Sequence, residues 1–312
     1  MNRPVAGFGS PDVSVVVPCR GHAGLLADCL EGLADQEAGA TFEVVVVDAA
    51  ADDRVAAVAA RYAFVRLVRS AEGLGPGPAR NLGVEAARGR ILAFTDADCV
   101  PSPGWLDAAH RALEAGARMV GGPILHARPD RAIAVADNLQ QFAEFPPTRP
   151  AGPATHFPTC NVALRTADFE AAGGFIDERL GEDLVLSREM RRKWPEGLRF
   201  VPQMRVAHLG RTGWRAMLEH NLLLGEWRGR LRLRVGDVQM RLGRSWLAVL
   251  PFAAWRWLYI VRITARWHPA GLARVVLLTP IVFPGLVAWA VGFRRGVRDG
   301  IPDPETPLKE RP

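Results

Sequence analysis

Short apolar runs alternate with amphipathic segments along the first 120 residues of the chain. The apolar runs are expected to be buried strands, and they cover residues 13–17, 42–47, 64–68 and 91–94. Between them, apolar residues recur at helical spacing within residues 25–33, 55–62 and 76–88. This alternation predicts an α/β fold whose Rossmann-like, mostly parallel sheet is flanked by helices on both faces.

Acidic residues directly follow two of these predicted strands. Asp48 comes after the strand at 42–47, and Asp96 and Asp98 come after the strand at 91–94. Ligands of open α/β sheets bind at the carboxyl ends of the strands, so the three carboxylates are expected to line one cleft. Residues i and i+2 of an extended chain point to the same side, so Asp96 and Asp98 can face one divalent ion such as Mg²⁺ or Mn²⁺.

A glycine-rich stretch precedes the fourth predicted strand. It runs from Gly73 to Asn81 and opens the helix predicted at 76–88. Backbone N–H groups at such a helix start can bind an anion, and Arg80 can add a positive charge. The stretch is not a Walker motif, because no Gly-Lys-Ser/Thr follows it. An ordinary flexible turn is the alternative interpretation.

The part of the chain between residues 121 and 210 is less regular. We expect a turn at 121–123, a loop at 146–158, helices at 166–172 and 182–194, and an extended segment at 200–208. The second of these helices begins with Glu182 and Asp183, and acids at that position also suit the helix dipole.

Two apolar segments, at about 246–264 and 272–293, dominate the C-terminal part. The second contains an uncharged run of 19 residues, from 275 to 293, which Pro280 and Pro284 interrupt. A run of that length can cross a bilayer. The first segment contains arginines that are costly at bilayer depth, namely Arg256 and Arg262.

Further arginines flank this pair of segments, with Arg241 and Arg244 before it and Arg294, Arg295 and Arg298 after it. The positive-inside rule then favours a helical hairpin with both ends in the cytoplasm. The hairpin is expected to span the membrane or to lie in its interface, as a C-terminal anchor to the cytoplasmic face. A soluble helical subdomain is the alternative.

The net charge and the cysteine content say little about which partner the protein binds. The formal charge of +6 and the pI of about 9.7 suit an anionic partner, such as nucleic acid, a nucleotide or an acidic membrane, or simply an arginine-rich surface. No C-x-x-C pair or zinc-ligand spacing occurs among the four cysteines, Cys19, Cys29, Cys99 and Cys160. We therefore expect reduced, mostly structural thiols on the cytosolic side, and no secretory signal within Met1 to Pro11.

Six short motifs occur in order between residue 13 and about residue 210. They are Val15-Val16-Val17-Pro18, Glu43 to Asp48, Ala79-Arg80-Asn81-Leu82-Gly83, Ile91 to Asp98, Gly173 to Glu178 and Gly181-Glu182-Asp183. As an ordered set they resemble glycosyltransferase family 2, whose members share the GT-A fold. The resemblance implies a nucleotide-sugar donor rather than a nucleic acid as the anionic partner.

The resemblance also implies a role for individual residues. The residues that would bind the nucleotide sugar are Pro18, Asp48, Arg80, Asn81 and Asp96. The divalent metal, Mn²⁺ or Mg²⁺, would be held by Asp98, with Asp96 and His208. The catalytic acids would be Asp183, as the base that deprotonates an acceptor hydroxyl, and its neighbour Glu182. A cation stabilises the charge that develops on a leaving diphosphate, and a single displacement assisted by a base inverts the anomeric centre.

Three of the candidate residues have an equally simple structural interpretation. His208 could equally be a structural histidine whose hydrogen bonds are all made within the protein. Asn161 could line the acceptor side or could be a turn asparagine. Trp214, like Trp194, could stack on a sugar, although core packing is the commoner role of tryptophan.

One departure from the family pattern concerns the nucleotide site. Members usually carry a second Asp followed by Gly-Ser after the position of Asp48, whereas this chain has Ala49-Ala50-Ala51-Asp52-Asp53. The base preference is therefore open. The Q-x-x-R-W motif of processive synthases is missing, and Gly225-Glu226-Trp227-Arg228 does not replace it.

Taken together, the sequence predicts a non-processive, inverting, metal-dependent glycosyltransferase that acts on a lipid-linked or cell-envelope glycan. The expected domains are a GT-A catalytic domain at 1–240, an apolar helical hairpin at 241–300 and a disordered tail at 301–312. Two alternatives are another nucleotide-dependent enzyme, such as a nucleotidyltransferase, and an inactive nucleotide-sugar-binding protein of the same fold.

Overall fold

The computed structural model describes residues 10–37, 39–70, 73–177, 180–235 and 245–300, which fall into two compact units. The sheet unit comprises the residues up to 127 together with 145–209, and the helical unit comprises 128–144 together with the residues from 210 onward. The units thus divide the chain at other points than the predicted boundary at residue 240, which stays a prediction. Several features named in the sequence analysis lie outside the described residues: the boundary at residue 240, Glu178, Arg241, Arg244 and the predicted tail at 301–312.

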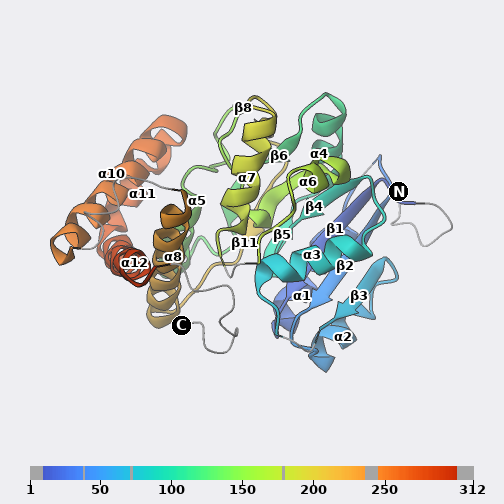
Figure 1. Cartoon of the computed structure of the whole chain (residues 1–312), viewed down its shortest axis with the longest axis horizontal. Coiled ribbons are helices and arrows are strands. Elements are labelled where there is room, and N and C mark those ends of the chain that lie inside the picture. Colours follow the sequence, from blue (N-terminus) through green and yellow to red (C-terminus); the bar gives the residue numbers. More distant parts are fainter. Residues whose placement is uncertain (1–9, 38, 71–72, 178–179, 236–244, 301–312) are drawn as a thin grey trace. The chain divides into compact units, whose positions relative to one another are not determined.

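The sheet unit is built on an eight-stranded sheet with the strand order β3-β2-β1-β4-β9-β6-β10-β8 (Figure 1). Its strands are β1 Val13–Cys19, β2 Phe42–Asp48, β3 Val65–Arg69, β4 Ile91–Phe94, β6 Met119–Gly121, β8 Gly152–Pro153, β9 Val162–Arg165 and β10 Leu198–Phe200. The strands β3, β2, β1 and β4 are parallel to one another, as the apolar runs predicted. Strand β9 runs antiparallel to β4 and β6, so the sheet is mixed rather than uniformly parallel.

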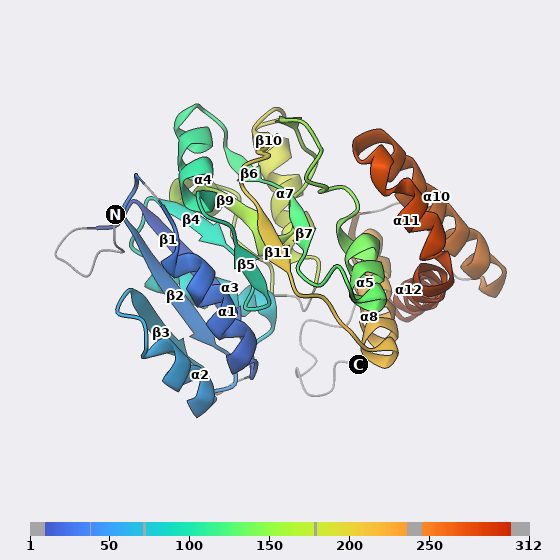
Figure 2. The ribbon, with the colours of Figure 1, turned by 180° about the vertical axis from the view of Figure 1, so that it is seen from behind.

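Helices cover both faces of this sheet, which explains why β1, β2 and β4 are buried along almost their whole length. The helices of the sheet unit are α1 Ala23–Ala34, α2 Asp53–Ala59, α3 Pro76–Ala86, α4 Trp105–Glu114, α6 Thr166–Ala171 and α7 Glu182–Lys193. Helix α3 lies in front of the sheet in Figure 1, and α1 lies in front of it in the reverse view of Figure 2. Helix α3 can approach the sheet closely because it carries Gly83, where a Cβ would lie 2.4 Å from Cγ1 of Val16.

Strand β1 marks the point at which the order of the sheet reverses. Strands β2 and β3 are added on one side of β1, and β4 is added on the other side. Ligands of open α/β sheets bind beyond the carboxyl ends of the strands at such a switch point. Asp48, the last residue of β2, and Asp96, two residues after β4, therefore lie on either side of the end of β1.

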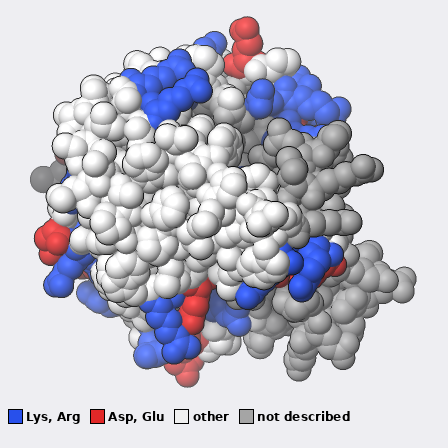
Figure 3. Space-filling view, turned by 90° about the vertical axis from the view of Figure 1, so that its left-hand side faces the viewer, with Lys and Arg blue, Asp and Glu red and all other residues white. Residues whose placement is uncertain are grey.

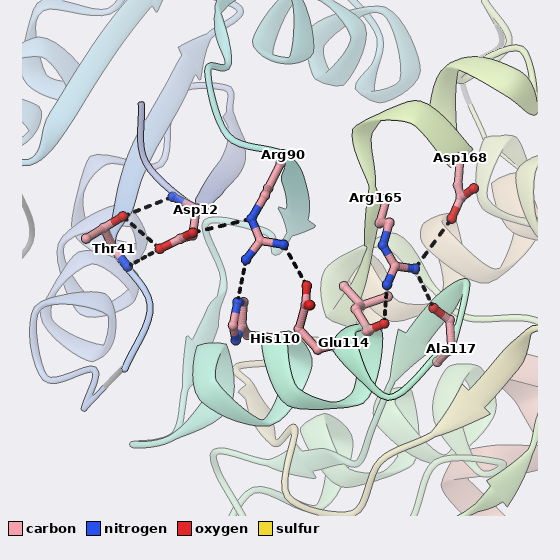
Figure 4. Close-up of polar contacts among 9 residues, drawn as sticks. Asp12, Thr41, Arg90, His110, Glu114, Ala117, Arg165 and Asp168 are labelled. Atoms are coloured by element: carbon pink, nitrogen blue, oxygen red, sulfur yellow. Dashed lines mark hydrogen bonds and ion pairs between the residues drawn. The ribbon is translucent and has the colours of Figure 1, made fainter. Parts of the chain in front are cut away.

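The opposite, amino ends of the same strands are fastened by polar contacts at the surface (Figure 4). Arg90, just before β4, donates to Asp12 over 3.3 Å and to Glu114 over 2.6 Å. Asp12, just before β1, accepts hydrogen bonds from Thr41, just before β2. These exposed pairs hold the strand starts in register and leave the carboxyl ends to form the site.

A second, three-stranded sheet with the order β5-β11-β7 also belongs to the sheet unit. Its strands are β5 Cys99–Pro101, β7 Ile124–His126 and β11 Val206–His208. In the antiparallel pair of β5 and β11, Cys99 is the direct partner of His208. This pairing brings the segment after Asp98 next to a histidine that is more than a hundred residues away in sequence.

The helical unit consists of helices only among its described residues. They are α5 Ala132–Phe142, α8 Trp214–Val235, α10 Val249–Trp267, α11 Leu272–Leu277 and α12 Thr279–Asp299, with short 3₁₀ turns η2 Trp246–Ala248 and η3 Pro269–Gly271. Helices α8 and α12 are in close contact because glycines face each other. A Cβ on Gly225 would lie 1.9 Å from the carbonyl oxygen of Trp289, and a Cβ on Gly292 would lie 1.9 Å from that of Leu222.

The uncharged run at 275–293, which Pro280 and Pro284 interrupt in the sequence, is divided between the two helices α11 and α12. The chain breaks between α11 and α12, and the two helices meet at 80°. The break falls at Leu278, just before the sequence Thr279-Pro280, where a proline suits the first turn of a new helix but not a helix interior. The 22-residue stretch Trp246–Trp267 is, by length and composition, the one described helix apolar enough to cross a membrane, and the bent pair would be a second span if counted as one.

Candidate functional site

A buried arginine joins two of the predicted motifs. The guanidinium of Arg80, on α3, lies 2.5 Å from Oδ1 of Asp96 and 2.7 Å from Oε1 of Glu182. Its side chain is only 3% exposed. Burial alone would lower the pKa of Arg80, but the carboxylates of Asp96 and Glu182 raise it, so the side chain stays charged. Arg80 therefore connects the end of β4 to the start of α7.

Asn81, the next residue on α3, fastens a third motif. Its amide nitrogen donates to the carbonyl oxygen of Phe175 over 2.8 Å, and its amide oxygen accepts from the N–H of Phe175 over 3.2 Å. Phe175 also lies against the guanidinium of Arg80, 5.9 Å from the ring centre. For Arg80 and Asn81, the structure thus shows contacts within the protein, and the predicted contact with a nucleotide sugar stays untested.

The two acids at the start of α7 differ in their surroundings. Gly181, with φ of 93°, allows the sharp turn into the helix. Glu182 is buried beside Arg80, whereas Asp183 is half-buried and accepts a hydrogen bond from the N–H of Leu184 over 2.7 Å. Burial raises the pKa of Glu182 to about 7, although Arg80 opposes the rise. Glu182 is thus a partner of Arg80, and Asp183 is the more accessible of the two carboxylates.

Asp98, Cys99 and His208 form the one group of possible metal ligands found among the described residues. Nε2 of His208 lies 3.6 Å from Oδ2 of Asp98, and Sγ of Cys99 lies 3.8 Å from Oδ1 of Asp98. One ligand atom from each residue lies within 4.8 Å of the others. A carboxylate, an imidazole and a thiol are a donor set that fits a transition-metal ion.

The sequence predicted Asp98 and His208 for this group, but it also predicted Asp96 and missed Cys99. Asp96 is turned toward Arg80. Cys99 was interpreted as a structural thiol, because no second cysteine stands at zinc-ligand spacing. Its only signal in the sequence is its place directly after the Asp-x-Asp segment, at the start of a strand.

The comparison with known families settles the relationship of the chain. The model of the family described as "Glycosyl transferase family 2" matches residues 14–170, which is half of the chain. The chain belongs to glycosyl transferase family 2. The match spans the strands β1, β2, β3 and β4 and the residues Arg80, Asp96 and Asp98, and it ends before α7.

Two curated proteins illustrate the similarity of this family 2 chain to its relatives. "Glycosyltransferase AglE" of Haloferax volcanii is 28% identical over 171 residues, which cover 53% of this chain and 56% of that protein. "Pre-mycofactocin glycosyltransferase" of Mycobacterium tuberculosis is 27% identical over 252 residues, which cover 75% of this chain and 50% of that protein. The chain thus spans about half the length of these relatives.

Among solved structures, the fold resembles that of the mannosyltransferase PcManGT from Pyrobaculum calidifontis, described in complex with GDP-Man and Mn²⁺. The TM-score is 0.58 at 20% identity, and the match covers 96% of this chain and 91% of that chain. At this identity the likeness shows the fold. It agrees with the GT-A architecture that the motifs of this family 2 chain imply.

The remaining predicted site residues of the family 2 chain are placed in different environments. Asp48 is fully buried, 3.6 Å from Nε of Arg69, and it accepts from the N–H of Ala50. Pro18 is half-buried near the end of β1. Trp194 lies 5.4 Å from the guanidinium of Arg118. Contacts of Asp48 and Pro18 with a nucleotide stay predictions.

Asn161 does not have the environment expected of an acceptor-side residue. Its side chain is fully buried, and its amide is engaged at both ends. The oxygen accepts from the indole N–H of Trp105, and the nitrogen donates to the carbonyl oxygens of Pro123 and Met204. Asn161 therefore links loops in the core. Trp214 is 44% exposed at the start of α8 in the helical unit, and its predicted acceptor contact stays a prediction.

Proposed function

We propose that this protein is a metal-dependent, non-processive glycosyltransferase that moves a sugar from a nucleotide diphosphate donor to an acceptor hydroxyl, with inversion. The observation that carries the proposal is the group of charged residues at the carboxyl ends of the strands. Arg80 links Asp96 to the helix that begins with Glu182 and Asp183. Asp98, two residues from Asp96, lies next to His208.

The donor half of the proposed site consists of Asp98 and His208. These residues would hold a divalent ion, and that ion would neutralise the charge that develops on a leaving diphosphate. An imidazole ligand suits Mn²⁺ better than Mg²⁺, which prefers oxygen ligands. The similar mannosyltransferase is described with GDP-Man and Mn²⁺, which supports the same classes of ligand here.

The acceptor half of the proposed site depends on Asp183. A carboxylate that is only half-buried can take a proton from an acceptor hydroxyl, whereas Glu182 is occupied by Arg80. Arg80 is then a positioning residue, because it holds the start of α7 and the end of β4 at a fixed spacing. Direct attack by the activated hydroxyl would give the inverted anomer.

We also propose that the helical unit attaches the protein to the cytoplasmic face of a membrane, which would suit a lipid-linked or cell-envelope acceptor. Seven large apolar side chains are exposed on η2, α10 and α11, and we name them the apolar face: Trp246, Leu247, Leu250, Trp255, Leu258, Val276 and Leu277. Figure 3 shows a broad surface without Lys, Arg, Asp or Glu, whose border contains more Lys and Arg than Asp and Glu. An apolar surface with cationic borders suits a bilayer that contains anionic lipids.

Arg256, the first of the three arginines within α10, does not oppose this attachment. The guanidinium of Arg256 donates to the carbonyl oxygen of Gln140 over 3.2 Å and lies 4.0 Å from the ring centre of Trp289. Its charge is thus satisfied inside the helical unit rather than on the apolar face. Arg262 and Arg266 are exposed further along the same helix, which favours a helix that lies in the interface over one that crosses it.

The proposed activity is tested by incubating the protein with nucleotide sugars and Mn²⁺ and by measuring the nucleoside diphosphate that is released. The wild type is expected to release it, and Asp98→Ala is expected to lose about 10²- to 10³-fold in rate, because the metal loses a ligand. Asp28→Ala, which removes an exposed carboxylate on α1, is the matched control and is expected to keep the rate. Equal rates for wild type and Asp98→Ala would contradict the proposal, and metal-dependent donor binding without turnover would favour a binding protein.

A further inference from the structure

The candidate metal site contains a sulfur ligand that the proposed function does not need. Cys99 follows Asp98 directly, and its backbone is paired with that of His208 between β5 and β11. Directly opposed residues of an antiparallel pair point to the same face of a sheet, so the thiol and the imidazole share one side. The N–H of Leu209 donates to the carbonyl oxygen of Asp98 over 2.9 Å, which extends this pairing to the residue before Cys99.

The three side chains offer ligand atoms that lie close together, within 4.8 Å of one another. Nε2 of His208 lies 3.6 Å from Oδ2 of Asp98, and Sγ of Cys99 lies 3.8 Å from Oδ1, the other oxygen of the same carboxylate. Two ligands of a tetrahedral zinc ion, with bonds of about 2.0–2.3 Å, lie roughly 3.3–3.7 Å apart. The side chains therefore need only small adjustments to bind one ion.

The thiol changes which ions the site prefers. Mg²⁺ binds oxygen ligands, whereas sulfur and imidazole ligands favour Zn²⁺, Co²⁺ and Cd²⁺. The Cys99 side chain is buried, so its sulfur is held in a fixed place beside Asp98.

We propose that Asp98, Cys99 and His208 form a binding site for thiophilic divalent ions, in which Zn²⁺ displaces Mn²⁺ and inhibits sugar transfer. The binding part of this inference depends only on the three side chains, and the inhibition rests on the proposed function. The ion replaces the thiol proton, which passes to solvent as the sulfur–metal bond forms. Coordination by a third protein ligand would also take a position that the donor diphosphate needs, so the Zn²⁺ form would transfer sugar slowly.

Cobalt provides a direct readout, because a thiolate bound to Co²⁺ gives an intense near-ultraviolet charge-transfer band. Titration of the full chain with Co²⁺ is expected to produce this band, Zn²⁺ is expected to remove it at an equivalent amount, and Mg²⁺ is expected to leave it. Cys99→Ser is expected to lose the band and to bind Co²⁺ roughly 10- to 100-fold more weakly. Cys29→Ala, which removes another buried thiol on α1, is expected to keep the band.

The outcomes separate this inference from the proposed function. If Co²⁺ stabilises the wild type against heat but gives no charge-transfer band, Cys99 is not a ligand, and the site consists of Asp98 and His208. A band that persists in folded Cys99→Ser would also show that Cys99 is not a ligand. No Co²⁺ binding at all, together with turnover that does not depend on metal, would overturn both proposals. The competition by Zn²⁺ uses only the wild type, so the test stands even if Cys99→Ser does not fold.

Discussion

The two units of this protein place their polar and apolar side chains in opposite ways. The sheet unit buries a charged group, Arg80 with Glu182, at the ends of its strands. The helical unit instead exposes its apolar groups, because all eight of the large hydrophobic side chains exposed among the described residues lie in it. Burying charge and exposing apolar surface both cost stability. Arg80 and Glu182 offset this cost by pairing with each other, whereas the large apolar side chains of the helical unit stay exposed, which supports the proposed contact with a membrane.

The largest expected effect concerns the sheet unit. Asp183→Asn removes the proposed base and is expected to lower the turnover rate by about 10²- to 10⁴-fold. The affinity for the nucleotide sugar is expected to change little, because the amide keeps the shape of the carboxylate. Turnover and donor binding measured on the same preparations check this, with the exposed Asp28→Asn as the control. An unchanged rate would remove Asp183 from the reaction.

Arg80→Met should have the largest effect on stability. The substitution leaves the buried Glu182 and the half-buried Asp96 without their shared cation. Removal of one partner from a buried pair costs about 3–5 kcal/mol. Urea unfolding measures the free energy, and Arg111→Met, which removes an exposed pair with Asp107, is expected to cost less than about 1 kcal/mol. Similar losses of unfolding free energy in the two variants would show that the buried pair stabilises the fold no more than an exposed pair does.

Membrane binding of the helical unit gives the next largest effect. Leu250→Ser combined with Trp255→Ser removes two side chains of the apolar face and is expected to weaken binding to anionic vesicles by roughly 2 kcal/mol, about 30-fold. Trp214→Ser removes an exposed tryptophan outside this face and is the control. Co-sedimentation measures binding. If the wild type does not sediment with vesicles, or if the double variant binds equally well, the apolar face has another role.

The smallest expected effect is a pH dependence in the sheet unit. The pKa of Glu182 is raised from 4.5 to about 7, chiefly by burial, so the folded state holds this proton more tightly than the unfolded chain does. The contribution of Glu182 to stability is therefore complete below about pH 4.5 and is lost as the pH rises through about 7. Glu182→Gln is expected to flatten this part of the curve of unfolding free energy against pH, whereas the exposed Glu196→Gln keeps it. Parallel curves for wild type and Glu182→Gln would contradict the assignment.

Much of the sheet unit could be predicted from the sequence because its signals are local. The valine-rich runs at β1 and β2 show buried strands directly, and the acids at the end of β2 and just after β4, Asp48 and Asp96, mark the edge of the sheet where the candidate site lies. The antiparallel strand β9 could not be predicted, because its place between β4 and β6 depends on long-range pairing. The inward turn of Arg256 was missed for a similar reason, since its partners Gln140 and Trp289 lie far away in sequence.

The sequence predicted which residues lie at the candidate site better than it predicted what each of them does there. The motifs identified Arg80 and Asn81, but their distant partners, Glu182 and Phe175, show that they join segments of the protein. The sequence left Asn161 open between an acceptor-side residue and a turn asparagine, and only the fold shows that its amide is hydrogen-bonded within the core. Cys99 could be recognised as a possible metal ligand only from the pairing of β5 with β11, which places it beside His208.

We propose that the sheet unit binds a nucleoside diphosphate through a metal ion held by Asp98. The most direct measurement is the melting temperature of the full chain with UDP or GDP, each with Mn²⁺ and with EDTA. A ligand that binds only the folded state at about 100 times its Kd adds about 2.7 kcal/mol of stability. At least one of the two nucleotides is expected to raise the melting temperature in the presence of Mn²⁺, and this rise is expected to be lost with EDTA and in Asp98→Ala. A rise that is the same with EDTA, or that persists in Asp98→Ala, would show that Asp98 does not bind the nucleotide through a metal.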